Sequence, residues 1–170
     1  MRCRLDARAS GLRVQVPRAV GAACLFTFQE LCGEAVGPSD YLALVSRFHT
    51  VALKGVTVFS GANRSIAYRF VALIDVLYDH RVKLLISADD YALNLFRNVQ
   101  TYAESKACRN DDAVIDDNLG FAKDRTISRL TEMQSIEYAI VHAERHAPEL
   151  LLALQEAQAH CASSVRSRHK

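Results

Sequence analysis

The sequence lacks a strong excess of either charge. Among its 170 residues, 21 Lys and Arg are set against 19 Asp and Glu, which leaves a formal net charge of +2. Proteins that bind nucleic acid through a strongly basic surface carry a larger excess, because Lys and Arg neutralise the phosphates. The balance therefore argues against nucleic acid as a partner, although it is compatible with a local basic patch.

Paired cysteines of the zinc-binding type are also missing. The five cysteines are widely spaced, odd in number and form no CxxC pair: Cys3, Cys24, Cys32, Cys108 and Cys161. We therefore predict no metal site, and reduced thiols in an intracellular compartment. Cys24 and Cys32 stand among apolar residues, so we expect them to pack in a core rather than to act as nucleophiles.

Long apolar segments are absent as well. No run approaches the roughly 20 residues that span a bilayer, and no signal-peptide core is visible, so we predict no transmembrane segment. Residues 1–20 form a basic N-terminal segment that is rich in arginine and has one acid. This composition fits a mitochondrial transit peptide or an ordinary basic loop that leads into a strand, and both interpretations stay open.

The clearest pattern is a strand, a helix and a strand over about residues 49–88. The helix is predicted at 63–80, where apolar residues recur at helical spacing: Ile66, Phe70, Leu73, Ile74 and Leu77. Strands are predicted at 49–56 and 82–88, and such a unit normally makes a right-handed crossover between parallel strands. Because half of the residues are hydrophobic, the sequence predicts one α/β domain with a core.

Other elements are predicted around this unit. A strand over 23–28 leads into a helical turn that ends at Gly33, and the next helix begins at Pro38 with Ser39 as its N-cap. Further predicted segments are a helix at 91–106 after Asp89 and Asp90, a polar loop at 104–120, a helix from about 121 to 147, and a final helix before a disordered tail at 163–170. We divide the chain into residues 1–20, 21–147 and 148–170.

Four segments together resemble one protein family. They read LFTFQELCG (25–33), GPSDYLALVSRFHTV (37–51), YRFVALIDVLYDHRVKLLISA (68–88) and FAKDRTISRLTEMQSIEY (121–138). In this order they are similar to the C-terminal half of the ZapE-type AAA+ ATPases, which in eukaryotes are the AFG-type or lactation-elevated-protein-type ATPases. The resemblance covers about residues 14–142.

The resemblance implies a fold, an activity and cofactors. It implies a partial P-loop AAA+ fold, with the parallel unit at 49–88 followed by C-terminal helices. Full-length members bind ATP and Mg²⁺, hydrolyse ATP, commonly form rings and act on protein clients. We therefore expect a possible homo-oligomer, and a mitochondrial location if the chain is eukaryotic or a cytoplasmic one otherwise.

The phosphate cradle of that family is missing from this sequence. A P-loop reads GxxxxGK[ST], and its nearest counterpart, GVTVFSGANRS at 55–65, has no Gly-Lys-Ser/Thr. An acidic Asp-Glu pair after an apolar strand, which would hold Mg²⁺, is missing too. We expect a fragment that is inactive alone, has no catalytic residue of its own and binds neither ATP nor Mg²⁺ tightly. The alternative is a degenerate copy that binds a partner without catalysis, for example a full-length family member.

Arginines of the family motif are the candidate site residues. Arg125 and Arg129 match RTxSRL, and the resemblance makes them candidates for sensing phosphate or contacting a neighbouring subunit. The helix predicted from about 121 would place Arg125 in its first turn, where the helix dipole favours an anion. The structural alternative is pairing with Asp124, Glu132 or the acidic segment 111–117.

The remaining polar candidates have structural alternatives. Arg69 is a third candidate by resemblance, or a solvated charge opposite the apolar stripe. Asp75 and Asp79 are expected to face solvent or to pair with Arg69 and Lys83. His142 and His146 lack the HExxH order of a zinc site and are expected to be solvated.

Overall fold

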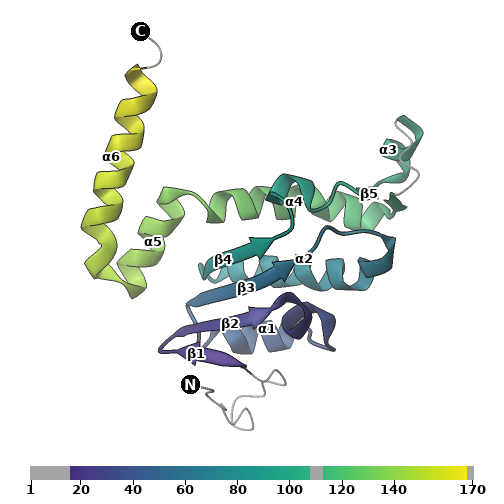
Figure 1. Cartoon of the computed structure of the whole chain (residues 1–170), viewed down its shortest axis with the longest axis horizontal. Helices are drawn as coiled ribbons and strands as arrows, with labels where there is room; N and C mark the ends of the chain where they lie inside the picture. Colours follow the sequence, from purple (N-terminus) through teal and green to yellow (C-terminus); the bar gives the residue numbers. More distant parts are fainter. Residues whose placement is uncertain (1–15, 108–112, 168–170) are drawn as a thin grey trace.

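A four-stranded sheet with helices on one face forms the centre of the structure (Figure 1). The computed structural model describes residues 16–107 and 113–167. Its strands lie in the order in which they occur along the chain: β1 (Arg18–Val20), β2 (Ala23–Thr27), β3 (Thr50–Val56) and β4 (Lys83–Ala88). β1 runs antiparallel to β2, whereas β2, β3 and β4 are parallel. The sheet thus begins within the N-terminal segment 1–20.

Two helices connect the parallel strands. α1 (Pro38–Val45) joins β2 to β3, and α2 (Arg64–Asp79) joins β3 to β4 after a short 3₁₀ turn, η3 (Gly61–Asn63). Because the strands are added in one direction, right-handed crossovers place both helices on the same face, behind the sheet in Figure 1. The predicted strand–helix–strand unit and the α/β class are confirmed.

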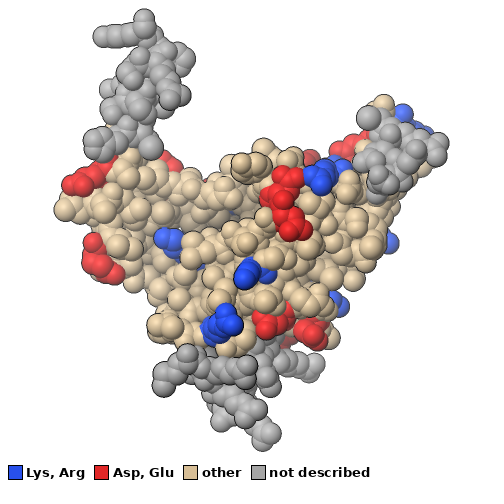
Figure 2. All heavy atoms as spheres, in the orientation of Figure 1, with Lys and Arg blue, Asp and Glu red and all other residues tan. Residues whose placement is uncertain are grey.

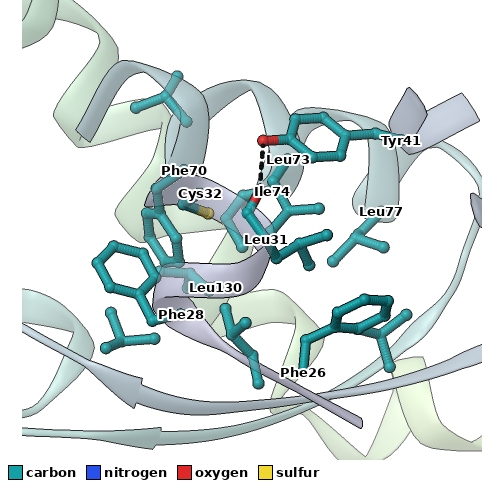
Figure 3. Close-up of a cluster of buried hydrophobic side chains, with 14 of the residues drawn as sticks. Phe26, Phe28, Leu31, Cys32, Tyr41, Phe70, Leu73, Ile74, Leu77 and Leu130 are labelled. Atoms are coloured by element: carbon teal, nitrogen blue, oxygen red, sulfur yellow. Dashed lines mark hydrogen bonds between the residues drawn. The ribbon is translucent and has the colours of Figure 1, made fainter. Parts of the chain in front are cut away.

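The core lies between this face and the two helices (Figure 3). Side chains from the sheet and from α2 are almost fully enclosed there: Cys24, Phe26, Val51, Leu53, Phe70, Leu73, Ile74 and Leu77. Burial raises the pKa of the Cys24 and Cys32 thiols to about 12, so they pack as neutral groups, as predicted. The Tyr41 hydroxyl donates to the Leu31 carbonyl over 3.1 Å and so ties α1 to the segment after β2.

Local capping corrects one predicted helix start. The turn after β2 is a π-helix, η2 (Gln29–Gly33), and it ends at Gly33 as predicted. α1 has Gly37 as its N-cap, not Ser39, because the Asp40 carboxylate accepts the Gly37 amide over 3.0 Å. Pro38 then occupies the first helical position, where its missing amide costs nothing.

The predicted helix at 91–106 is wrong before Tyr102. That segment contains a 3₁₀ turn, η4 (Ala92–Asn94), a two-residue strand, β5 (Val99–Gln100), and all of the short helix α3 (Tyr102–Ala107) except its last residue. β5 pairs in parallel with β6 (Val114–Ile115), inside the segment predicted to be a loop. Leu95, Phe96 and Val99 have helical spacing but are buried as separate contacts of a turn and a strand, so tertiary packing overrides the periodicity.

Helices form the C-terminal part of the chain. They are α4 (Asp117–Met133), α5 (Ile136–His146), the 3₁₀ turn η5 (Pro148–Leu150) and α6 (Leu151–Ser167). The single predicted helix over 121–147 is broken, because the Ser135 hydroxyl caps a new helix by accepting the Tyr138 amide over 3.1 Å. α4 begins at Asp117, so Arg125 lies in about the third turn, not the first.

The last helix projects from the rest of the structure (Figure 1). α6 contacts α5 and η5, and it extends to Ser167, into the segment 163–170 for which the composition predicts disorder. Residues 168–170 lie outside the described part. Among the helices that the structure describes, none combines the length and the apolar character needed to cross a membrane.

Removal of the Phe70 side chain tests the core. The ring centroid of Phe70 lies 5.2 Å from that of Phe59 and 5.9 Å from that of Phe28, and the residue is fully buried. Phe70→Ala should lower the free energy of unfolding by about 3–5 kcal/mol, measured by urea denaturation, because it removes a buried ring and leaves a cavity. Tyr91→Ala, at a side chain that is 83% exposed, should change it by less than about 0.5 kcal/mol. A loss below about 1 kcal/mol for Phe70→Ala would contradict this core.

Candidate functional site: the arginine face of α2 and α4

The two family-motif arginines of α4 converge on one carboxylate of α2. Nη2 of Arg125 lies 2.9 Å from Oδ2 of Asp75, and Nη1 of Arg129 lies 2.6 Å from Oδ1 of the same residue. Nη2 of Arg129 also lies 3.4 Å from Oδ1 of Asp79. We call these four residues the arginine face. Asp75 receives one arginine on each of its oxygens.

Helical spacing produces this arrangement. Arg125 and Arg129 are four residues apart on α4, and Asp75 and Asp79 are four apart on α2, so each pair lies along one side of its helix. The two helices pack side by side, which brings the pairs together. The expected structural pairing exists, but among the described residues its ion pairs lead to Asp75 and Asp79 rather than to Asp124, Glu132 or residues 113–117 of the acidic segment. Residues 111 and 112 of that segment lie outside the described part.

The predicted partners of the two aspartates are wrong as well. Asp75 and Asp79 pair with α4, not with Arg69 and Lys83. The Arg69 guanidinium instead donates to the carbonyl oxygens of Cys32 and Gly33 over 3.1 and 3.2 Å. It therefore caps the end of η2, so the alternative of a solvated charge is also wrong. No observation tests a phosphate role for Arg69.

The two arginines of the face differ in freedom. The Arg129 side chain is 22% exposed, contacts two carboxylates and places its guanidinium carbon 4.8 Å from the centroid of the Tyr78 ring. The Arg125 side chain is 54% exposed and has one ion pair. Exposed ion pairs contribute little free energy and exchange readily with water. Arg125 is therefore the arginine that can turn toward an incoming anion.

A second polar link lies at the end of the same helix pair. The Tyr78 hydroxyl donates to Glu132 over 2.5 Å, and Nη1 of Arg81 lies 3.2 Å from the other oxygen of that carboxylate. The hydrogen bond from Tyr78 holds the pKa of Glu132 below its usual value and raises the pKa of Tyr78. Glu132 is thus occupied by Tyr78 of α2 and by Arg81, just after α2, rather than by Arg129 of its own helix.

The sequence reasoning missed Asp116, which anchors the start of α4. Its carboxylate accepts the Leu119 amide as the helix N-cap, the Tyr68 hydroxyl over 2.8 Å and Nε of Arg64 over 2.5 Å. Burial alone would raise the pKa of Asp116, but these three hydrogen bonds outweigh it and hold the pKa below its usual value. An Asp just before an apolar position is an N-cap signal that could have located it.

Three histidines form a cluster where α5 meets the sheet. The ring centroid of His49 lies 4.4 Å from that of His146 and 5.3 Å from that of His142. His142 is buried, and its Nε2 donates to the His49 carbonyl over 2.9 Å, so the expected solvated state is wrong for this residue. Within the described residues no group of His, Cys, Asp or Glu has an arrangement that would hold a metal ion.

Comparison with known proteins identifies the family. The model of the family described as AFG1-like ATPase matches residues 4–141, which include all of the arginine face. The chain belongs to this family. This family and the α/β fold agree with the resemblance seen in the sequence. No solved structure matches the chain.

Relatives cover this chain only with a part of their own length. Cell division protein ZapE of Escherichia coli K12 is 37% identical over 112 residues, which are 66% of this chain and 25% of ZapE. Lactation elevated protein 1 homolog B of Danio rerio is 32% identical over 148 residues, 76% of this chain and 29% of the relative. An uncharacterised Schizosaccharomyces pombe protein is 38% identical over 79 residues, 46% of this chain and 17% of the relative. The AFG1-like chain thus spans less than a third of these relatives.

The histidine cluster makes stability depend on pH. Burial lowers the pKa of His142 and of His146. The hydrogen bond to the His49 carbonyl opposes this shift of the His142 pKa, but burial and the neighbouring positive charges outweigh it. As pH falls below about 6.5, the unfolded chain takes up protons that the folded chain resists, so stability is present above that pH and is lost toward the lowered pKa values. The urea concentration at the unfolding midpoint should therefore decrease as the pH is lowered from 7.5 to 5.5.

His142→Gln is the matched control, because glutamine still offers a donor for the His49 carbonyl but does not titrate. Its urea midpoint should depend less on pH over the same interval than that of the unchanged protein. Equal pH slopes for the two proteins would show that burial of His142 does not cause the dependence.

Proposed function

We propose that this chain works as the part of an AFG1-like AAA+ ATPase that lies outside the P-loop. The supporting observation is Arg125, half exposed beside an Arg129 that is anchored on α2, in a chain without a phosphate cradle. ATP and Mg²⁺ would be held by a P-loop outside residues 1–170. The chain alone would bind neither tightly and would not hydrolyse ATP.

The chemistry of phosphoryl transfer gives Arg125 its role. A P-loop holds the phosphates with backbone amides and a lysine, and an arginine from elsewhere neutralises the charge that develops on the transferred group. Arg125 can leave Asp75 at low cost, because Arg129 continues to neutralise that carboxylate. Arg129 would act as a positioning residue that holds α4 in place. Arg69, bonded to η2, is the weakest of the three candidates.

Cellular context forms part of the same proposal. Family kinship supports protein clients and association with other copies or with a full-length member. The arginine-rich residues 1–20 favour a mitochondrial location if the chain is eukaryotic, and the cytoplasm is the alternative. A second function, partner binding without catalysis, is supported by the uncovered face of the sheet described below.

An ATPase chimera tests the proposal. Residues 21–147 of this chain would replace the matching segment of E. coli ZapE, and ATP turnover would be measured at saturating ATP and Mg²⁺. The chimera should hydrolyse ATP, and Arg125→Ala should lower kcat by about tenfold or more with little change in KM, because the charge acts in the transition state. Residues 1–170 alone should show no turnover.

Arg97→Ala is the matched control. Its side chain is 55% exposed and forms one ion pair, with Asp90, as Arg125 does with Asp75. The control should retain full turnover. An active chimera whose turnover is unchanged by Arg125→Ala would remove the catalytic assignment, and hydrolysis by the chain alone would contradict the missing cradle. A folded chimera that binds nucleotide without hydrolysing it would favour the non-catalytic function.

A further inference from the structure

One face of the central sheet is left without helices. α1 and α2 lie behind the sheet in Figure 1, and the strands lie in front of them. Parallel strands normally have both faces covered, because βαβ units place helices on them. The described elements of this chain cover only one.

Strand register places an apolar row across this uncovered face. Leu25 of β2 pairs with Ala52 of β3, and Ala52 pairs with Leu85 of β4, so the three side chains point to the same side. Leu85 is 53% exposed, whereas Phe26 and Leu53, which point to the helices, are each 1% exposed. The row would span about 10 Å, since neighbouring strands lie roughly 4.8 Å apart.

Basic side chains surround the row. Arg18 pairs with Leu25 on the β1 side, Lys83 pairs with Thr50 at one end of β3, and Lys54 lies two residues beyond Ala52 at the other end. We call Leu25, Ala52, Leu85, Arg18, Lys54 and Lys83 the open face. Figure 2 shows Lys and Arg side chains in the middle of this side of the molecule and Asp and Glu side chains around it.

Acidic partners for these cations are missing from the strands. No strand residue of β1 to β4 is Asp or Glu. Glu30, at the margin, is held by the Thr27 hydroxyl and amide over 2.8 and 2.7 Å. Among the described residues, no ion pair uses Arg18, Lys54 or Lys83. The cations are therefore available to an external carboxylate.

We propose that the open face binds an acidic amphipathic helix of a protein partner. A helix is the element that covers the faces of parallel sheets, and its diameter of about 10–12 Å matches the width of the apolar row. A helix above β3 would place leucines over Ala52, the small residue between Leu25 and Leu85. Carboxylates beside its apolar stripe would reach Lys54 and Lys83.

Charge selects this occupant over others. A second copy stacked face to face would set Lys54 and Lys83 against like charges, which is unfavourable. A nucleic acid would neutralise the cations but would leave the apolar row without a complementary stripe. The open face extends along β3 from Thr50, beside Lys83, to Lys54, which is about 13 Å. A partner helix of roughly nine residues would span this length. The assignment does not depend on the proposed ATPase function.

Fluorescence anisotropy with designed peptides tests the assignment on the full chain. The probe is a labelled 18-residue amphipathic peptide with leucines at i, i+3, i+4 and i+7 and glutamates beside them. Its counterpart carries lysines at the glutamate positions. The acidic peptide should bind saturably and about tenfold or more tightly than the basic one, with the difference reduced in high salt. Equal binding of the two peptides, or of neither, would overturn the proposal.

Variants locate the binding surface. Lys54→Glu combined with Leu85→Thr should weaken binding of the acidic peptide by about tenfold, because it reverses one charge and removes one apolar contact. Lys106→Glu combined with Leu152→Ser, at exposed positions on α3 and α6, is the control and should leave binding unchanged. Circular dichroism confirms that each variant is folded.

Other occupants give distinct results. Sedimentation would overturn the proposal if the free chain associated and Leu85→Thr abolished that association, because the open face would then bind a second copy. Binding to phosphatidylglycerol vesicles, measured by flotation, or to single-stranded DNA is a second alternative. Either would overturn the proposal if Lys54→Glu abolished that binding and the acidic peptide did not compete with it.

Discussion

The position of α4 on α2 depends on buried and half-buried carboxylates between the two helices. Asp75 of α2 neutralises two arginines of α4, and Asp116, just before α4, receives Arg64 and Tyr68 of α2. Because the apolar stripe of α2 is already buried against the sheet, α4 meets the more polar side of that helix. Leu119, Leu130 and Met133 of α4 are nevertheless buried in the core. The ion pairs and hydrogen bonds set how α4 lies along α2, and Glu132 completes them at the far end.

These polar links run in order along both helices. Arg64 at the start of α2 meets Asp116, just before α4, and Tyr78 near the end of α2, with Arg81 just after it, meets Glu132 near the end of α4, so the helices lie parallel. One consequence is functional. Arginine is the side chain best suited to bind phosphate. The Arg129 guanidinium is mostly enclosed by its contacts with α2, whereas the Arg125 side chain is about half exposed. In this AFG1-like chain, Arg129 is therefore the anchoring arginine, and Arg125 keeps the more exposed guanidinium.

Periodicity predicted the elements that bury one continuous stripe. The spacing of Phe70, Leu73 and Leu77 was sufficient to predict α2, and the short apolar strands on either side of it predicted the parallel unit. The same reasoning failed at Leu95, Phe96 and Val99, which have helical spacing but are buried from a turn and from β5. The spacing of apolar residues shows which side chains can be buried, but it does not show which surface buries them.

Partners of charged side chains were the least predictable feature. The sequence shows that Asp75 and Arg129 carry opposite charges, but they are separated by 54 residues, and only the packing of α2 on α4 brings them together. The sequence alone therefore favours nearby acids such as Asp124 and Glu132 as partners. The one-sided covering of the sheet was also hidden, because Leu85 belongs to an apolar run that resembles a strand buried on both faces.

A double-mutant cycle on Asp75 and Arg129 tests the central claim that this ion pair holds α4 on α2. Urea unfolding of Asp75→Asn, Arg129→Gln and the double variant gives the coupling free energy between the two side chains. We expect a coupling of about 1–3 kcal/mol, because the Arg129 side chain is mostly enclosed and one carboxylate serves both arginines. Additive effects, with a coupling below about 0.3 kcal/mol, would contradict the account and would leave Arg129 as free as Arg125 to meet a phosphate.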